Sequence, residues 1–165
     1  MLGELNGQQI ENVLHAEVIG RIGCHVDGRT YIVPITYAYD GTSIYGHSAA
    51  GLKVTMMRAN PSVCFEVEHV DDLANWSSVI AWGSFEELRG DAATSGMQTL
   101  LDRLMPLMAS ASGQPSHGLG PDGVPSGSAQ RAAEDHRADT AGKAAVLYRI
   151  RLTEKTGRFE THLSR

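Results

Sequence analysis

Residues 18–47 read VIGRIGCHVDGRTYIVPITYAYDGTSIYGH, and this stretch decides the fold class. Apolar residues alternate with polar or small ones on both sides of Asp27-Gly28, and a second Asp-Gly pair follows at 40–41. Alternation with a period of two is typical of strands that bury one face, and Asp-Gly favours a tight hairpin turn. The stretch therefore predicts three consecutive antiparallel strands joined by two turns, over residues 18–26, 29–40 and 42–47.

The same patterns continue outside this stretch. Alternating segments predict three more strands, over residues 62–70, 76–88 and 145–152. A helix is predicted to begin after Ser48, its N-cap, to run into residues 54–59 and to end before Pro61. A second helix is predicted over 95–108, where apolar residues recur at helical spacing. Six strands with hairpin links and two or three helices indicate a mainly β, α+β domain built as a closed or split six-stranded barrel.

Two local features refine this barrel. Pro34 lies inside the second predicted strand and has no N–H to donate to a neighbour. An edge position accounts for it most simply, and a bulge or a contact with something other than a strand are the alternatives. The methionines of the predicted helices are expected to fill the core, namely Met56, Met57, Met105 and Met108.

The composition changes between about residues 109 and 145. This segment is rich in Gly, Ala and Pro, and Leu119 and Val124 are its only large apolar side chains. Such a segment buries too little apolar surface to offset the entropy of ordering it. We therefore expect one domain over residues 1–165, interrupted by a flexible insertion at about 109–145. The GLGPDG run at 118–123 matches a dinucleotide-binding fingerprint by chance, because no strand precedes it.

Charge and motif content argue against several functions. Acidic residues outnumber basic ones over residues 1–108, whereas nucleic acids require a broad basic face. The seven histidines lack metal-ligand spacing, and no G-x-S-x-G motif indicates a hydrolase. Two separated cysteines and the absence of a leader segment favour a reduced, cytoplasmic protein. No apolar run approaches the ~20 residues of a membrane-spanning helix.

The segment HSAAGLK at 47–53 carries the sharpest chemical signal, because it lies between a predicted strand and a predicted helix. The start of a helix offers free N–H groups and the positive end of a dipole. Together with the Ser48 hydroxyl and the Lys53 ammonium, these groups would hold a phosphate. The alternative at this point is a capped helix with an exposed lysine.

A family resemblance runs through VPITY (33–37), IYGHS (44–48), GLK (51–53), NPSVCFEV (60–67), SVIAWG (78–83), YRIRL (148–152) and TGR (156–158). In this order the segments resemble the pyridoxamine 5′-phosphate oxidase-like flavin-binding proteins. Within that family the sequence is most similar to the nitroimidazole-resistance (Nim-type) branch. The resemblance covers most of the chain outside the insertion.

The resemblance implies a split β-barrel homodimer that binds FMN at the subunit interface, with neither nucleic acid nor membrane as a partner. The strand that passes the flavin ring would contribute Ile32, Val33, Pro34, Ile35, Thr36 and Tyr37. The phosphate would be held by His47, Ser48, Leu52 and Lys53, and Ser78 would contact the flavin through a polar side chain. A histidine near the flavin is treated as functional in Nim-type proteins; His47 matches it, with His69 as the second choice.

The departures from the family pattern shape the expected reaction. Ile32 and Tyr37 stand where the vitamin oxidases have basic residues, and the C-terminal Trp…Arg substrate signature is missing. We therefore expect an FMN-dependent oxidoreductase other than a true pyridoxamine phosphate oxidase, with electrons passing from a reduced nicotinamide to a small substrate such as a nitroaromatic compound. The alternatives are a flavin or haem carrier, a deazaflavin-dependent reductase, and a barrel without a cofactor that serves as an interaction module.

Overall fold

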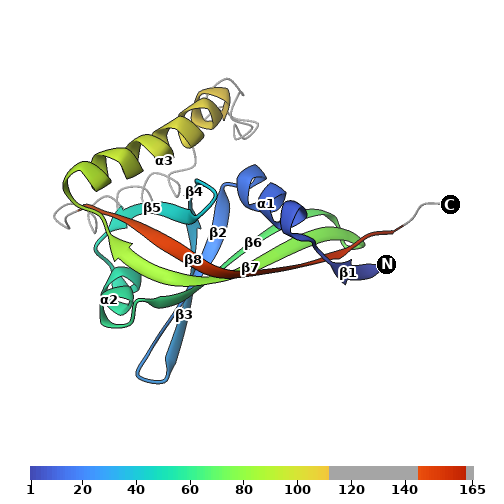
Figure 1. The fold of residues 1–165 in the computed structure, drawn as a ribbon, viewed down its shortest axis with the longest axis horizontal. Coiled ribbons are helices and arrows are strands. Elements are labelled where there is room, and N and C mark those ends of the chain that lie inside the picture. Colours follow the sequence, from blue (N-terminus) through green and yellow to red (C-terminus); the bar gives the residue numbers. More distant parts are fainter. Residues whose placement is uncertain (112–144, 163–165) are drawn as a thin grey trace, which may run out of the picture.

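The computed structural model describes residues 1–111 and 145–162, which form one antiparallel sheet with helices packed against it (Figure 1). The strands lie in the order β3-β2-β6-β7-β8-β5-β4, and β1 pairs with the end of β8. The elements are β1 (Leu2–Glu4), α1 (Gly7–Ala16), β2 (Ile19–Val26), β3 (Arg29–Thr36), β4 (Ala38–Tyr39), β5 (Ser43–Ala49), α2 (Leu52–Ala59), β6 (Ser62–Asp72), β7 (Asn75–Glu87), α3 (Gly90–Ala111) and β8 (Ala145–Glu160). The mainly β, α+β prediction is confirmed. The described residues form eight strands rather than the predicted six, because β1 was not predicted and the predicted strand 29–40 is divided into β3 and β4.

The hairpin of β2 and β3 is built as the sequence predicts. Asp27 and Gly28 both have positive φ, 50° and 74°, which matches the right-handed twist of the flanking strands. β3 lies at one end of the sheet order, so Pro34 is on an edge strand and the edge interpretation is confirmed. The Asp27 conformation is also one that aspartate tolerates better than most residues.

The predicted strand 29–40 is interrupted at Tyr37, which separates β3 from β4. The Tyr37 N–H donates to the Val18 carbonyl at 2.9 Å. Because β3 and β4 lie at opposite ends of the sheet order, this break carries the chain from one sheet edge to the other. The barrel is therefore split.

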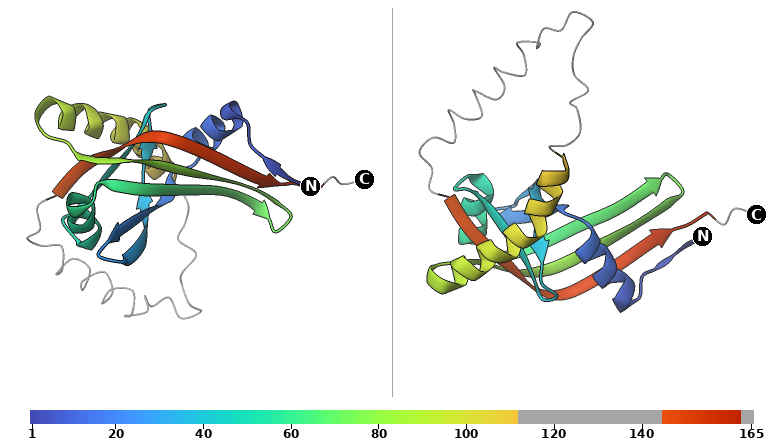
Figure 2. Two further views of the ribbon diagram at one scale, coloured as in Figure 1. Left: turned by 60° about the horizontal axis from the view of Figure 1, so that its bottom comes forward. Right: turned by 90° about the horizontal axis from the view of Figure 1, so that it is seen from above.

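β8 runs to Glu160, well past the predicted end at Leu152. Its first half pairs with β5, and it pairs with β7 over nearly its full length. Beyond the barrel, β6, β7 and β8 continue as a long twisted arm (Figure 2). Apolar and polar residues alternate less regularly there, because the arm exposes more of its surface. The alternation alone therefore predicts too early an end for this strand.

The core lies inside the curled sheet. The inward residues of β2 and β6 are buried, as their alternation predicts: Ile22, Cys24, Val63, Phe65 and Val67. Val54, Met56 and Met57 of α2 and Leu14 of α1 join the same cluster. The expectation that Met56 and Met57 fill the core is therefore confirmed.

α1 was not predicted from the sequence. It begins with a capping box, in which the Asn6 side chain accepts from the Gln9 N–H at 3.0 Å and the Gln9 side chain accepts from the Asn6 N–H at 2.9 Å. Its buried residues, Ile10 and Leu14, lie four positions apart on one face. The capping box and this spacing are the signals that could have located the helix.

α3 packs against the outside of the sheet. Leu100 lies in a second apolar cluster with Ala38, Tyr45 and Leu147. Met105 and Met108 are 55% and 66% exposed, so the expectation that they fill the core is wrong. Residues 112–144, most of the predicted insertion, lie outside the described residues.

Two buried tyrosine hydroxyls give a stability prediction. Tyr148 is fully buried, and its hydroxyl has no hydrogen-bond partner among the described residues. A buried, unpaired hydroxyl costs roughly 1–3 kcal/mol. We expect Tyr148→Phe to raise the free energy of unfolding by about 1 kcal/mol, measured by urea denaturation.

Tyr37→Phe is the matched control. The Tyr37 hydroxyl donates to the Leu14 carbonyl at 2.9 Å, near the C-terminal end of α1, where carbonyls lack helical partners. Its loss should lower the free energy of unfolding by about 1 kcal/mol. If Tyr148→Phe destabilised the protein as much as Tyr37→Phe, the Tyr148 hydroxyl would have a partner in solution and the prediction would be wrong.

Candidate functional site

The turn from β5 to α2 is the first part of the candidate site. α2 begins after Gly51, whose backbone is extended, and no side chain caps the helix. Ser48 is not the N-cap, contrary to the prediction, because it is still paired with Val146 in the sheet. Its hydroxyl donates to the Ala49 carbonyl at 3.1 Å. The start of α2 therefore lacks a side-chain cap, and the Ser48 hydroxyl lies one strand residue before the turn.

Lys53 is in the first turn of α2 and is half-buried. Its ammonium forms no hydrogen bond or ion pair within residues 1–111 and 145–162. Burial lowers the pKa of this ammonium, and the neighbouring Cys24 opposes the shift. Arg58, also on α2, is instead held by two 2.9 Å contacts with the Glu87 carboxylate. Lys53 is thus the cation that α2 offers to an anion.

His47 and Ser48 point to opposite faces of β5, because side chains alternate along a strand. The exposed His47 lines a hollow of about 540 Å³ with α3 residues, including Thr94 and Gln98. Leu52, the remaining predicted phosphate residue, is exposed at the start of α2. The structure therefore brings Ser48, Leu52 and Lys53 to one turn, while the His47 imidazole faces α3.

β3 presents two different faces. Its outward residues, Ile32, Pro34 and Thr36, are exposed. Val33 is half-buried and Ile35 is buried, and the Tyr37 side chain after the strand lies in the core against Phe65. A ligand beside β3 would therefore meet the outward side chains and the free edge of the strand.

Ser78 lies far from this turn within one chain. On β8, Leu147 is opposite His47 and Arg158 is opposite Ser78. Eleven residues separate these two positions, which is about 36 Å along the strand at ~3.3 Å per residue. One copy of the chain therefore does not place Ser78 beside the β5–α2 turn.

His69 also lies on the arm, on β6. Its Nδ1 is 2.6 Å from a Glu17 carboxylate oxygen, and its Nε2 is 3.3 Å from Asp71. The hydrogen bond to Glu17 and the two negative charges raise the pKa of His69. His69 thus links β6 to the residue that follows α1.

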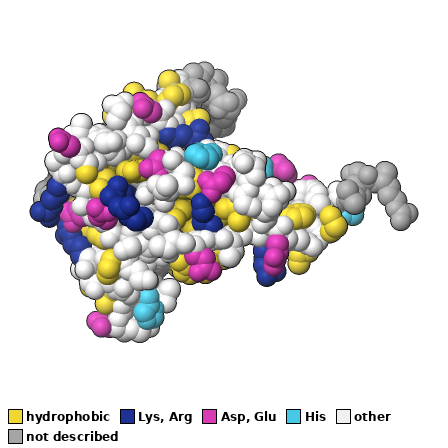
Figure 3. Space-filling view, viewed as in Figure 1, with side chains coloured by type: hydrophobic (Ala, Val, Ile, Leu, Met, Phe, Trp, Pro, Cys, Tyr) yellow, Lys and Arg dark blue, Asp and Glu magenta, His cyan; other side chains and the backbone are white. Residues whose placement is uncertain are grey.

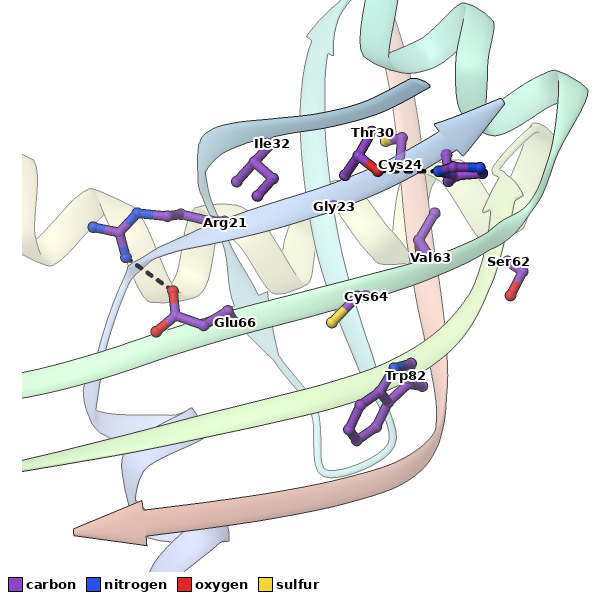
Figure 4. Close-up of a pocket in the computed structure, with 11 residues that line it drawn as sticks. Arg21, Gly23, Cys24, Thr30, Ile32, Ser62, Val63, Cys64, Glu66 and Trp82 are labelled. Atoms are coloured by element: carbon purple, nitrogen blue, oxygen red, sulfur yellow. Dashed lines mark hydrogen bonds and ion pairs between the residues drawn. The ribbon is translucent and has the colours of Figure 1, made fainter. Parts of the chain in front are cut away.

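An apolar groove on the outer face of the sheet was missed by the sequence analysis. It has a volume of about 440 Å³, and its lining includes Ile32, Gly23, Cys64 and Trp82. Figure 4 shows these residues on four strands, β3, β2, β6 and β7. Their proximity depends on strand register, which the sequence pattern does not give.

The basic residues of β8 are paired rather than free. Glu86 on β7 accepts from Arg149 at 2.8 Å and from Arg151 at 3.4 Å. On the face shown in Figure 3, Lys and Arg side chains lie among Asp and Glu. A solvated, ion-paired strand face therefore accounts for the basic C-terminal segment.

Residues 6–117, which include β3 and the β5–α2 turn, match the family described as pyridoxamine 5′-phosphate oxidase. The chain belongs to this family. The predicted family is confirmed, and so is the split-barrel fold.

Several solved structures have a similar fold. An FAD-binding protein of Mesorhizobium loti is 27% identical, with a TM-score of 0.67, and the match covers 98% of this chain and 99% of that one. An FAD-binding protein of Mycobacterium smegmatis is 20% identical, with a TM-score of 0.59 and coverage of 97% and 100%. A Bacteroides thetaiotaomicron protein provisionally named for 5-nitroimidazole resistance is 18% identical, with a TM-score of 0.60 and coverage of 96% and 87%. The last two share the fold alone.

A curated relative, an uncharacterised protein of Rhizobium meliloti (strain 1021), is 34% identical over 84 residues. The match covers 51% of this chain and 56% of the relative, so the chain spans just over half of that protein's length. In the described part of this family member, no helix is long and apolar enough to cross a membrane.

Proposed function

We propose that this protein binds a flavin, and that the flavin phosphate binds at the β5–α2 turn. The observation that carries the proposal is Lys53, a half-buried cation without a partner in the described chain, at a helix start that no side chain caps. The N–H groups of that helix start and a charged amine are the groups that bind phosphate in proteins. The FAD-binding relative from Mesorhizobium loti supports the choice of a flavin.

We infer that the flavin is FMN. FMN ends in a single phosphate monoester, which one ammonium and one helix start can surround, whereas the diphosphate of FAD continues into an adenosine that needs further room. Arg58, the other cation of α2, is held by Glu87. The compact anion site at the β5–α2 turn of the described chain therefore favours FMN.

The proposed functional unit is a homodimer with FMN at the subunit interface. Within one chain, the positions opposite His47 and Ser78 are about 36 Å apart along β8. A Ser78 that contacts the flavin must then come from a second copy, whose β6–β7–β8 arm would reach the turn. Residues 1–165 act as one domain in this proposal.

The proposed activity is electron transfer from a reduced nicotinamide through the flavin to a small substrate such as a nitroaromatic compound. The flavin supplies the hydride-accepting chemistry when bound. The protein's own residues orient it: Lys53 holds the phosphate, and Ile32, Pro34 and Thr36 present the outward face of β3 to the ring. His47 is still the proposed catalytic residue. Because its imidazole faces α3, the bound flavin or substrate would have to extend around β5 to contact it.

Absorbance spectroscopy tests this function. Purified protein incubated with FMN and separated from free flavin should keep an FMN spectrum in roughly one-to-one ratio with the chain. Riboflavin, which lacks the phosphate, should bind about tenfold or more weakly, because it loses a charge-assisted contact. Equal binding of FMN and riboflavin would contradict a phosphate site. NADH oxidation by the loaded protein then separates an enzyme from a flavin carrier.

A further inference from the structure

Side chains from distant parts of the chain hold the C-terminal end of α1. The Tyr37 hydroxyl and the Arg103 guanidinium each donate to a carbonyl of the last turn of α1, at 2.9 and 2.6 Å. A third contact joins His69 on β6 to the carboxylate of Glu17, the residue that follows α1. α1 thus packs against β6 and β7, where the arm begins (Figure 1).

Both ring nitrogens of His69 face carboxylate oxygens. Nδ1 is 2.6 Å from a Glu17 oxygen, and Nε2 is 3.3 Å from an Asp71 oxygen. An ionised carboxylate only accepts hydrogen bonds, and a neutral imidazole has a single N–H to donate. The protonated ring has two, so it alone can donate to both carboxylates. The geometry is therefore that of an imidazolium between two carboxylates.

The surroundings of His69 favour its charged form. A polar cleft of about 360 Å³ between α1 and the arm is lined by His69 and also by Glu160 of β8. Arg103 of α3 is occupied by a carbonyl of α1, and His15 of α1 packs against the Tyr39 ring, with 4.8 Å between the ring centroids. The C-terminal end of a helix itself attracts positive charge. The hydrogen bond to Glu17 and the nearby negative charges raise the pKa of His69.

Among the contacts that hold this end of α1, the one made by His69 changes its charge near neutral pH. An arginine stays protonated, and burial raises the pKa of Tyr37. A histidine that binds its proton more tightly in the docked state stabilises that state fully below its ordinary pKa of about 6.5. This stabilisation is lost as the pH rises through the raised value.

We propose that His69 and Glu17 form a pH-sensitive latch, which holds the C-terminal end of α1 on β6 while the imidazole is protonated and loosens when the proton leaves. The same helix end carries Leu14, which is fully buried in the core, and accepts the hydrogen bond from Tyr37, the residue after β3. The latch would therefore transmit a change of pH to the end of β3. The proposal rests on these contacts and does not depend on flavin binding.

Hydrogen exchange tests the latch. The readout is the protection factor, corrected for intrinsic exchange, of amides at the end of α1, such as the Glu17 N–H that donates to the Val13 carbonyl at 3.2 Å. We expect this protection to fall about two- to fivefold from pH 6 to pH 8.5, the size of an exposed ion pair. The Ile10 N–H, which donates to the Asn6 carbonyl near the start of α1, is the internal control and should change less.

Three variants separate the latch from other causes of such a fall. His69→Arg carries a permanent charge and should keep at pH 8.5 the protection that wild type has at pH 6. His69→Gln carries no charge and should show the lower protection at both pH values. His15→Gln is the matched control, because it removes the other histidine at this end of α1, and it should behave as wild type.

Wild-type protection that does not change with pH would overturn the proposal, and so would a fall that persists in His69→Gln. Loss of the pH dependence in His15→Gln would also overturn it, because the other histidine would then be responsible. An NMR titration of the wild-type imidazoles gives an independent check: a pKa of His69 at or below about 6.5 would mean that Glu17 does not hold the proton. His69 is exposed, so its substitution leaves the core intact.

Discussion

Lys53→Ala is expected to weaken FMN binding by about 1–3 kcal/mol, which is roughly 5- to 150-fold in the dissociation constant. The reason is the loss of a charge-assisted contact to the phosphate at a half-buried position, where water screens the charge poorly. A fluorescence titration of FMN measures the effect. Riboflavin affinity should change little in the same variant, because riboflavin has no phosphate to lose.

Arg58→Ala is the matched control for this experiment. Arg58 lies on the same helix and carries the same charge, but Glu87 holds its guanidinium. We expect its FMN affinity to stay within about twofold of wild type. If Lys53→Ala bound FMN as tightly as wild type, or if Arg58→Ala lost as much affinity, the phosphate would not be bound through Lys53.

Gly83→Ala is expected to destabilise the protein by about 2–3 kcal/mol, as overpacked sites do. A Cβ at Gly83 would collide with the Arg151 carbonyl oxygen and lie 2.9 Å from Ile150 Cγ2. The carbonyl belongs to the backbone of β8 and cannot rotate away as a side chain could. The strands shift register between Trp82 and Gly83, which brings the two backbones close.

Thermal unfolding should show the Gly83→Ala effect as a decrease in Tm of roughly 5–10 °C. Gly23→Ala is the control, because the nearest atom to its new Cβ is 3.7 Å away. We expect the Tm of Gly23→Ala to stay within about 2 °C of wild type. A Gly83→Ala variant as stable as the Gly23→Ala variant would mean that β7 and β8 can separate locally at little cost.

The sequence correctly predicted the strands and turns that depend on residues close together along the chain. The alternation on both sides of Asp27-Gly28 gave β2 and β3, because a strand with one buried face needs that pattern. Pro34 indicated the sheet edge, because a residue without an N–H is tolerated there. The resemblance located the family correctly because its motifs follow one another in order along the chain.

Other predictions were wrong where a distant part of the chain decided the outcome. Ser48 is a typical N-cap residue, but pairing with Val146 keeps it in β5, and the N-cap of α2 is Gly51 instead. β8 continues past Leu152 because β7 provides a partner there. Met105 and Met108 have the apolar character of core residues, yet their side chains are exposed.

The sequence by itself determined the hairpin of β2 and β3, the edge position of Pro34 and the presence of Lys53 at the start of a helix after a strand. Only the tertiary structure decided which side chains meet. In the described chain Arg58 forms an ion pair with Glu87, whereas the Lys53 ammonium has no partner. His47 and Ser48 lie on opposite faces of β5, and His47 faces α3. The tertiary structure also placed Gly23 between Ile32 and Cys64. The physical reason is that strand register and pairing, which join residues far apart in the chain, fix neighbours across a sheet, whereas a sequence pattern fixes only neighbours along one strand.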